Sequence, residues 1–326
     1  MAENKKFSYR ARTERRPQCG VRDNAGDGEL RHRNAGQQGV NMKVLVTGYE
    51  GQLGWDVVRT LEARGVPCRG ADVSDFDLRD GAAVKAFVQD YAPDVIVHCG
   101  AYTAVDKAES EPEICAAVNG DGTMNMVRAA LSVGAKMVYI STDYVFSGEG
   151  ETPWTEDAPY GPQNVYGLSK VQGEIAVRSL MKRYFLIRTS WVYGVHGHNF
   201  VRTMLKLGRE KTEIRVVDDQ IGAPTYSADL ARVICDLIPT EKYGIYHVTN
   251  EGYMSWAHFA KLILAGQGLW CRIQPIPSSE YPTPARRPLN SRMSMARLKE
   301  SGIQPMPSVE NALGRYLQEL ALEKME

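Results

Sequence analysis

Short runs of β-branched and other apolar residues alternate with amphipathic segments through the first half of the chain, and this alternation constrains the fold most strongly. We expect strands at 43–47, 68–72, 95–99, 136–140 and 185–188. We expect the helices between them at 53–64, 81–91, 113–133 and 169–181. Strands that alternate with helices at this spacing form parallel β-α-β units, so the sequence predicts an α/β fold with a doubly wound parallel sheet.

The alternation weakens after about Trp191, where the chain becomes rich in Gly, Pro, Tyr and Trp. Helices are still expected at 200–208, 227–237 and 256–264. We therefore interpret 42–190 as the domain built on the parallel sheet, and 191–326 as mainly a smaller C-terminal α/β lobe that binds a substrate. Segments near 213–240 are expected to return to the first domain.

The first 41 residues differ from the rest in composition. They contain nine basic and five acidic residues and almost no apolar periodicity. A basic segment without a hydrophobic core does not offset the entropy cost of ordering, so we expect a mobile N-terminal extension. It lacks the continuous apolar stretch of a signal peptide. A gene-start or expression extension is the simpler interpretation, and a functional basic arm is the alternative.

Charge and composition argue against several classes of protein. Lys and Arg together number 39, and so do Asp and Glu, so no general attraction to nucleic acid is expected. No apolar run reaches the roughly 18 residues of a membrane span. The six cysteines contain no C-x-x-C pair, which is typical of reduced thiols in a cytoplasmic protein without a zinc site. A homodimer is compatible with the sequence, but nothing in it specifies one.

Three glycines with the spacing G-x-x-G-x-x-G follow the first expected strand and open the first helix. Gly48 allows a tight turn, Gly51 lets the backbone approach a pyrophosphate, and Gly54 lets the helix pack closely on the sheet. The N-terminus of the helix offers free N–H groups and a partial positive charge to phosphates. This strand–loop–helix context predicts a Rossmann-type site for a dinucleotide.

Residues at the ends of later strands extend this candidate site. Asp72 ends the second strand, where a carboxylate accepts hydrogen bonds from the ribose hydroxyls of NAD and repels a 2′-phosphate. Asp77 and Leu78 are expected near the adenine. Three more residues follow the third strand at the carboxyl edge of the sheet, where ligands bind in this architecture: Ala101, Tyr102 and Thr103.

Tyr166 and Lys170 form a Y-x-x-x-K pair, and on a helix residues i and i+4 lie on one face. A free tyrosine has a pKa near 10, and we expect the nearby ammonium to lower that pKa by favouring the phenolate. Thr142 ends the fourth strand at the same edge of the sheet, where it can orient an oxygen that is being protonated. Hydroxyl, phenol and ammonium together predict the acid–base centre of a carbonyl reductase.

Motifs from Met42 to the C-terminal helix resemble one family, the dTDP-4-dehydrorhamnose reductases within the extended short-chain dehydrogenase/reductases. The motifs that carry the resemblance are TGYEGQLG, VIVHCGAYTAVDKAESEP, YISTDYVFSG, NVYGLSK, IRTSWVYG, VVDDQIGAPT and YPTPARRPLNSRM. The glycine loop and Y-x-x-x-K are shared by the whole superfamily. RTSWVYG, DQIGAPT and PTPARRP in that order are much more specific to the family.

The resemblance implies a role for each matching residue. It implies cofactor binding by Gly51, Gln52 and Leu53 at the pyrophosphate, by Asp72, Asp77 and Leu78 at the adenosine, and by Ala101, Tyr102, Thr103, Tyr166 and Lys170 at the nicotinamide. Thr142 and Asp143 would contact the sugar, and Trp191 would wall the hexose pocket. Some members are described with magnesium. Here only Asp56 offers an acidic contact and Ala228 is apolar, so we expect no catalytic metal.

The resemblance also implies a reaction, the reduction of the 4-keto group of dTDP-4-dehydro-β-L-rhamnose to dTDP-L-rhamnose for surface polysaccharide. The substrate is dTDP-4-dehydro-6-deoxy-L-mannose under its systematic name, and the cofactor is NADPH or NADH. Tyr166 would be the general acid, Lys170 would hold the ribose, and Thr142 would donate a second hydrogen bond.

The diphosphate of such a substrate needs cationic partners in the C-terminal lobe. Arg286 and Arg287 are the candidates, because guanidinium groups match phosphate oxygens, with a plain surface pair as the alternative. Two other functions stay open. One is an NAD-dependent nucleotide-sugar epimerase or dehydratase, which returns the hydride to its substrate. The other is a non-catalytic NADP-binding regulatory subunit.

Overall fold

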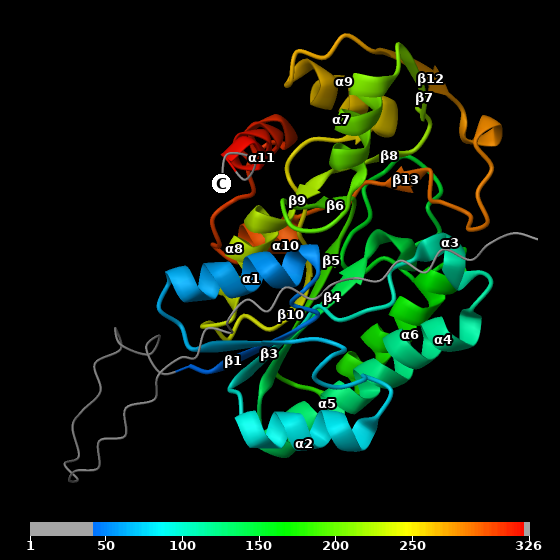
Figure 1. The fold of residues 1–326 in the computed structure, drawn as a ribbon. Helices are drawn as coiled ribbons and strands as arrows, with labels where there is room; N and C mark the ends of the chain where they lie inside the picture. Colours follow the sequence, from blue (N-terminus) through cyan, green and yellow to red (C-terminus); the bar gives the residue numbers. More distant parts are fainter. Residues whose placement is uncertain (1–41, 323–326) are drawn as a thin grey trace, which may run out of the picture. The chain divides into compact units, whose positions relative to one another are not determined.

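The structure is a computed structural model that describes residues 42–322. The basic extension expected at 1–41 lies outside the described residues. The strands of the central sheet are β1 Val44–Thr47, β2 Cys68–Ala71, β3 Val95–His98, β4 Lys136–Thr142, β5 Tyr184–Thr189 and β10 Gly244–His247. They are all parallel and lie in the order β10-β5-β4-β3-β1-β2 (Figure 1). This order confirms the predicted doubly wound fold.

Helices cover both faces of the central sheet (Figure 1). The helices on one face are α1 Gln52–Ala63, α8 Ser227–Leu237 and α10 Ala296–Glu300. The helices on the other face are α2 Gly81–Tyr91, α5 Gly122–Val133 and α6 Val165–Leu180. Val44 and Val46 of β1 pack toward the first group, whereas Leu45 packs toward the second, as the two-residue period of a strand requires.

The single helix expected at 113–133 is broken into three elements. They are α4 Pro112–Ala116, the π-helical turn η1 Ala117–Asp121, and α5. Such π turns are rare in proteins, and those that occur are often found at functional sites. Here the turn carries Asn119, whose buried side chain accepts the N–H of Tyr102 at 2.8 Å and donates to its carbonyl oxygen at 3.0 Å. The turn therefore fixes the backbone of the segment that follows β3.

The helix expected at 169–181 begins earlier, because α6 starts at Val165. The Asn164 side chain accepts the N–H of Gly167 at 2.7 Å, and Glu109 accepts the N–H of Val165 at 2.9 Å. These side chains satisfy N–H groups that have no partner within the first helical turn. The apolar period alone missed this capped first turn, which carries Tyr166.

The C-terminal lobe has its own hydrophobic core. Its helices are α7 Phe200–Glu210, α9 Trp256–Ala265 and α11 Val309–Leu322. Its paired strands are β7 Glu213–Val217 with β12 Arg272–Ile276, β6 Val192–Tyr193 with β9 Thr225–Tyr226, and β8 Ile221–Gly222 with β11 Met254–Ser255 and β13 Asn290–Ser291. The segments near 213–240, which were expected to return to the first domain, do so only in part. Helix α8 packs on α1, but β7 pairs with β12, and the later strand β10 joins the central sheet.

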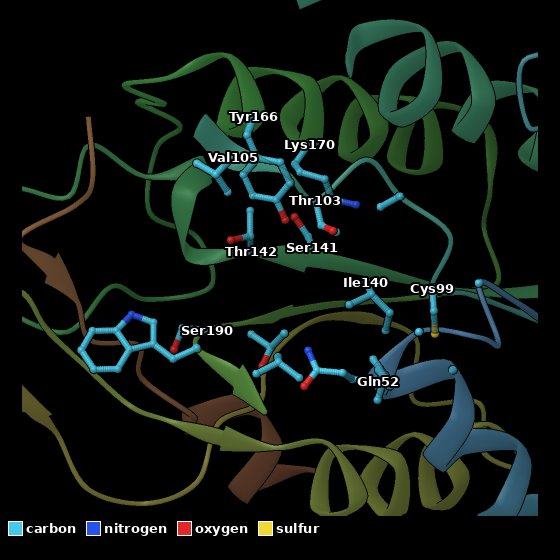
Figure 2. A pocket seen from close by; sticks show the side chains of 18 of the residues that line it. Gln52, Cys99, Thr103, Val105, Ile140, Ser141, Thr142, Tyr166, Lys170 and Ser190 are labelled. Atoms are coloured by element: carbon cyan, nitrogen blue, oxygen red, sulfur yellow. The ribbon is translucent and has the colours of Figure 1, made fainter. Parts of the chain in front are cut away.

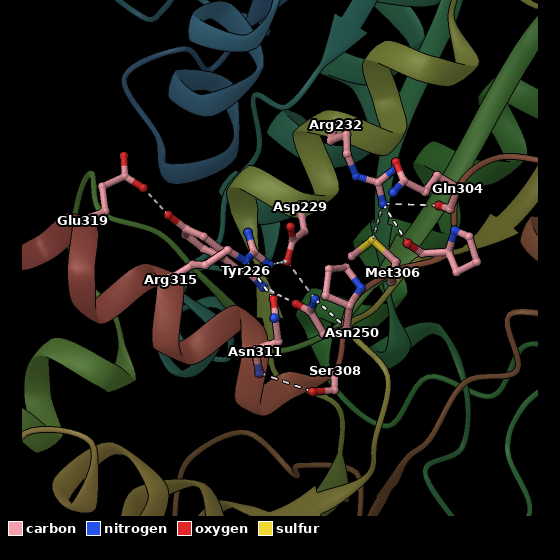
Figure 3. Close-up of polar contacts among 12 residues, drawn as sticks. Tyr226, Asp229, Arg232, Asn250, Gln304, Met306, Ser308, Asn311, Arg315 and Glu319 are labelled. Atoms are coloured by element: carbon pink, nitrogen blue, oxygen red, sulfur yellow. Dashed lines mark hydrogen bonds and ion pairs between the residues drawn. The ribbon is translucent and has the colours of Figure 1, made fainter.

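Polar contacts join α8 and the segments around it to α11 (Figure 3). Arg315 donates to an Asp229 carboxylate oxygen at 2.6 Å, and Asn250 donates to the same oxygen at 2.9 Å. Tyr226 donates its hydroxyl to Glu319. These contacts fix the last described helix on the rest of the fold. Within 42–322, none of the helices combines the length and the apolar character needed to cross a membrane.

Candidate active site

A cavity of about 620 Å³ opens at the carboxyl edge of the central sheet (Figure 2). Residues far apart in the sequence meet in its wall. The predicted site residues that line it are Gly48, Gly51, Gln52, Leu53, Asp72, Ala101, Thr103, Thr142, Asp143, Tyr166, Lys170 and Trp191. The glycine loop and the Y-x-x-x-K pair therefore face one common space.

A second, smaller cavity of about 250 Å³ continues from the first past the glycine loop. Both cavities are lined by Gly48, Asp72, Gly100 and Ala101. The second adds the two residues predicted near the adenine, Asp77 and Leu78, together with apolar Ile114 and Val118. The two cavities form one elongated trough whose apolar end can take a planar base.

Tyr102 behaves differently from its neighbours Ala101 and Thr103. Its side chain lines neither of these two cavities, and its hydroxyl donates to Glu111 at 2.9 Å. Its backbone is held by Asn119, as described above. The structure thus brings the peptide of Tyr102, but not its ring, to the edge of the predicted cofactor site.

The glycine loop is closely packed. Gly48 has a φ of +66°, and a Cβ there would lie 2.6 Å from the backbone nitrogen of Gly100. A Cβ on Gly54 would collide with the carbonyl oxygen of Gly48. Because no side chain caps α1 at Gly51, its first N–H groups remain available to a ligand at the loop.

The Gln52 side chain ties the glycine loop to the segment after β6. Its Oε1 accepts the N–H of Gly194 at 2.8 Å and an Asn199 amide N–H at 3.1 Å. On the same segment, the His196 ring stacks on Trp55 with 4.4 Å between ring centroids. Gly197 and His198 line the main cavity beside this contact. We name residues 194–199 the crossing loop, because they cover the glycine loop from the C-terminal half.

The side chains of Tyr166 and Thr142 lie next to each other between α6 and the end of β4, where both line the main cavity. The expected lowering of the Tyr166 pKa by Lys170 is not found. Burial and the nearby Asp143 carboxylate raise the pKa of Tyr166 instead. The Lys170 ammonium lies over the ring of Tyr139, 4.2 Å from its centroid. The phenol therefore stays protonated in the free protein, which is the state that a general acid needs.

Lys170 itself is buried, with only 3% of its surface exposed. Burial lowers the pKa of its ammonium to about 8, and the charge of Glu174 opposes that shift. Glu174 was not predicted from the sequence, although it lies four residues beyond Lys170 on the same helix face.

Asp143 is buried, and both of its carboxylate oxygens have partners. Thr142 donates to one oxygen at 3.0 Å, and Ser291 of β13 donates to the other at 2.5 Å. Burial raises the pKa of Asp143 to about 6. Asp143 therefore orients the Thr142 hydroxyl and links the end of β4 to the C-terminal lobe.

Trp191 lines the main cavity in a left-handed backbone conformation, with a φ of +51°. Its ring stacks on Trp256 with 3.6 Å between centroids. A side chain at Gly222 would collide with the Trp191 ring, because a Cβ there would lie 2.8 Å from it. Trp256 was not predicted as a site residue, and it lines both this cavity and the next one.

A third cavity of about 760 Å³ lies in the C-terminal lobe and shares Tyr144 and Trp256 with the main one. Its wall combines aromatic side chains with cationic ones, including Phe200, Tyr281, Lys211, Arg215 and Arg287. Arg287 makes a two-pronged ion pair with Asp106 of α3 (Val105–Ala108), at 2.8 and 2.9 Å. Arg286 does not line this cavity and contacts Gln163 and Glu149 instead.

Comparison with known proteins agrees with this geometry. Residues 42–322 match the family described as RmlD substrate binding domain. The spore coat polysaccharide biosynthesis protein SpsK of Bacillus subtilis is 43% identical over 85% of this chain and 97% of its own length. A dTDP-4-dehydrorhamnose reductase of Streptomyces griseus is 40% identical over 80% of this chain and 88% of its own length.

A solved structure gives the same result. The dTDP-4-dehydrorhamnose reductase of Bacillus anthracis in complex with NADP is 42% identical and has a TM-score of 0.84, over 86% of this chain and 99% of that one. The resemblance found from the motifs is therefore confirmed. The chain belongs to the RmlD family, whose curated relatives are dTDP-4-dehydrorhamnose reductases.

Proposed function

We propose that this protein reduces the 4-keto group of dTDP-4-dehydro-β-L-rhamnose to give dTDP-L-rhamnose, with NADPH or NADH as the reductant. The observation that carries the proposal is that the Tyr166 phenol and the Thr142 hydroxyl meet in a cavity that the glycine loop also lines. Relatives named dTDP-4-dehydrorhamnose reductase, one of them solved with NADP, support the same activity.

The residues of the trough fit a nicotinamide dinucleotide. Gly51 and Leu53 would hold the pyrophosphate at the start of α1, and Lys170 would hold the ribose next to the nicotinamide. Asp72 would accept from the other ribose, because each carboxylate oxygen has two lone pairs and only one backbone N–H partner, Val73 or Glu50. The bound cofactor supplies the hydride, and the protein supplies position and protons.

The side chains around Tyr166 account for proton transfer to the ketone oxygen. Tyr166 donates its proton to the C4 oxygen as the negative charge develops there. Thr142 lies beside it and donates its hydroxyl hydrogen to Asp143 in the free protein, so Thr142 would stabilise the C4 oxygen by exchanging this acceptor for the ketone oxygen. Lys170 keeps a positive charge near the reacting groups while it is protonated, below its pKa of about 8.

The third cavity fits the nucleotide half of the substrate. Aromatic rings of Tyr144, Phe200 and Trp256 offer flat apolar surfaces for a pyrimidine base. Arg287 and Arg215 offer guanidinium groups for the diphosphate. Since Trp256 lines this cavity and the main one, a sugar placed between them would reach Tyr166 while the nucleotide stays in the C-terminal lobe.

The test is to mix the protein with NADPH and the 4-keto sugar nucleotide, and to measure NADPH absorbance and identify the product. Loss of one NADPH for each rhamnosyl nucleotide formed is the expected result. A product isomer without net oxidation of NADPH would favour the epimerase instead. NADPH binding without any turnover would favour the non-catalytic regulatory subunit.

A further inference from the structure

A buried ion pair lies directly behind the wall of the main cavity. Glu174 follows Tyr166 by eight residues and Lys170 by four, so the three side chains share one face of α6. The Glu174 side chain is 0% exposed, and that of its partner Arg188 on β5 is 1% exposed. A pair of charges this deeply buried costs free energy unless hydrogen bonds satisfy all of its polar atoms.

The carboxylate of Glu174 has a full set of donors. Arg188 donates to both of its oxygens, from Nε at 2.9 Å and from Nη2 at 2.7 Å. Ser141 donates to Oε1 at 2.6 Å, and Tyr160 donates to Oε2 at 2.7 Å. Glu174 therefore connects α6 to β4 through Ser141 and to β5 through Arg188.

One of these donors belongs to the active site. Ser141 lines the main cavity next to Thr142 (Figure 2). The β4–β5 register places Ser141 directly opposite Arg188. Because its hydroxyl hydrogen goes to Glu174, Ser141 presents only lone pairs to the cavity. The buried pair thus decides which hydrogen-bonding role Ser141 has toward a ligand.

Glu174 also acts on Lys170. Of the charged groups that affect the Lys170 ammonium, Glu174 has the largest effect, and it favours the protonated form. The remaining titratable groups that face Lys170 are Cys99 and His98 at the end of β3, Cys115 of α4, Tyr139 of β4 and Tyr166. Burial raises the pKa of Cys99 to about 12 and lowers that of His98 to about 3, so both are neutral near pH 7.

We propose that Glu174 is a positioning residue for the reduction, which locks α6 onto β4 and β5 and places a buried carboxylate one helical turn beyond Lys170. The inference rests on the proposed function and goes beyond it. It extends the Y-x-x-x-K face by one helical turn to a Y-x-x-x-K-x-x-x-E face. Arg188 is the counter-ion that makes this buried carboxylate tolerable.

The test removes the carboxylate without leaving a buried unpaired charge. Glu174→Gln alone strands the Arg188 guanidinium, so the main variant is Glu174→Leu combined with Arg188→Met, a replacement that buried ion pairs often tolerate. We expect a folded protein whose kcat falls by about 10-fold or more. We expect the alkaline limb of its kcat–pH profile to move down by about one pH unit.

Two further variants separate charge from geometry. Glu174→Asp keeps the charge and shortens the side chain, so kcat should fall while the alkaline limb stays in place. Arg64→Met with Asp236→Asn makes the corresponding change at a partly exposed ion pair of 2.8 Å outside the cavities and should alter neither quantity. If the main variant does not fold, Glu174→Gln with Arg188→Met preserves the shape of the carboxylate and gives the same comparison.

A readout without turnover keeps this inference separate from the proposed function. The ¹³C shift of the Lys170 ε-carbon, followed against pH, should show a lower midpoint in the pair variant than in the wild type. If the wild type does not reduce the keto sugar, the proposed function fails, and this midpoint still tests Glu174. A folded pair variant with wild-type kcat, alkaline limb and Lys170 midpoint would overturn the inference.

Discussion

The catalytic face of α6 and the mouth of the third cavity hold their charged groups in opposite ways. On α6, Lys170 and Glu174 are buried, and the carboxylate of Glu174 has four donors inside the protein. At the mouth, the Arg287 side chain is 28% exposed and that of its partner Asp106 is 42% exposed. Because this pair is partly exposed, water screens it, and phosphate oxygens can compete with Asp106 for the Arg287 guanidinium.

This contrast predicts that changes on the catalytic face of α6 and changes at the mouth of the third cavity affect different kinetic constants. Groups fixed by packing cannot rearrange when substrate arrives, so they should determine kcat. Groups held by partly exposed pairs can exchange their partners for a ligand, so they should determine KM for the sugar nucleotide. The variants below test this division, from the largest expected effect to the smallest.

Removing the phenol of Tyr166 should have the largest effect. We expect Tyr166→Phe to lower kcat by about 10²–10⁴, because the ketone oxygen loses its positioned proton donor. KM for the sugar nucleotide should change little. The rate of NADPH oxidation at saturating substrate measures the effect. Tyr243→Phe, at a phenol outside the described cavities, is the control, and a Tyr166→Phe protein with kcat within twofold of wild type would contradict the division.

The catalytic face was predictable because its signal is local. Four-residue spacing on one helix determines that Tyr166 and Lys170 point the same way, whatever the rest of the chain does. The direction of the Tyr166 pKa was not predictable from spacing. It depends on how deeply the phenol is buried and on Asp143, which follows a different strand.

Removing Arg287 should have the next largest effect, on KM rather than on kcat. A charge-assisted hydrogen bond contributes about 1.5–3 kcal/mol, so Arg287→Ala should raise KM for the dTDP-sugar by about 10–100-fold. KM for NADPH should stay within twofold. Arg286→Ala should raise the sugar KM by no more than about threefold, because Arg286 does not line the third cavity. If Arg287→Ala and Arg286→Ala raised the sugar KM equally, the conclusion that only Arg287 binds the diphosphate would be wrong.

The sequence identified this arginine pair but could not distinguish its members. Their roles differ because of partners far away in the chain, Asp106 for Arg287 and Glu149 and Gln163 for Arg286. Trp256 was missed for the same reason, since its stacking on Trp191 depends on packing between α9 and the segment after β5. No periodicity encodes such contacts, whereas the order of the sheet follows from the alternation of strands and helices.

Asp56, a buried carboxylate away from the catalytic face, tests how much burial of a charge lowers the free energy of unfolding. Asp56 accepts a hydrogen bond from Ser227, and burial raises its pKa from 3.8 to about 6. A carboxyl with a raised pKa stabilises the fold below pH 4, and this contribution is lost as the pH rises through about 6. Asp56→Asn keeps an acceptor for Ser227 without the charge, so it should stabilise the protein by about 2 kcal/mol above pH 7.

Thermal unfolding at pH 4 and at pH 8 measures this effect. The melting temperature of Asp56→Asn should exceed that of wild type by a few degrees at pH 8, and the difference should shrink toward pH 4. Asp90→Asn, at a carboxylate that is 82% exposed, is the control. A difference that does not change with pH would mean that the charge of Asp56 is not what burial penalises.

The smallest effect is expected where the two halves of the molecule meet, at the crossing loop. Gln52 supplies the acceptor for Gly194 and Asn199, so Gln52→Met should release this loop while keeping the volume of the side chain. Two neutral hydrogen bonds contribute about 0.5–1.5 kcal/mol each, and bonds to water recover part of that, so KM for NADPH should rise about 3–10-fold.

Gln267→Met, at an exposed glutamine outside the cavities, is the matched control for this change. The sugar KM and kcat should stay near wild type in Gln52→Met, because the crossing loop covers the glycine loop and not Tyr166. A larger change in kcat than in the NADPH KM would mean that the crossing loop also orders the catalytic face. In that case the buried and the exposed regions are coupled through Gln52, and the division between kcat and KM would not hold.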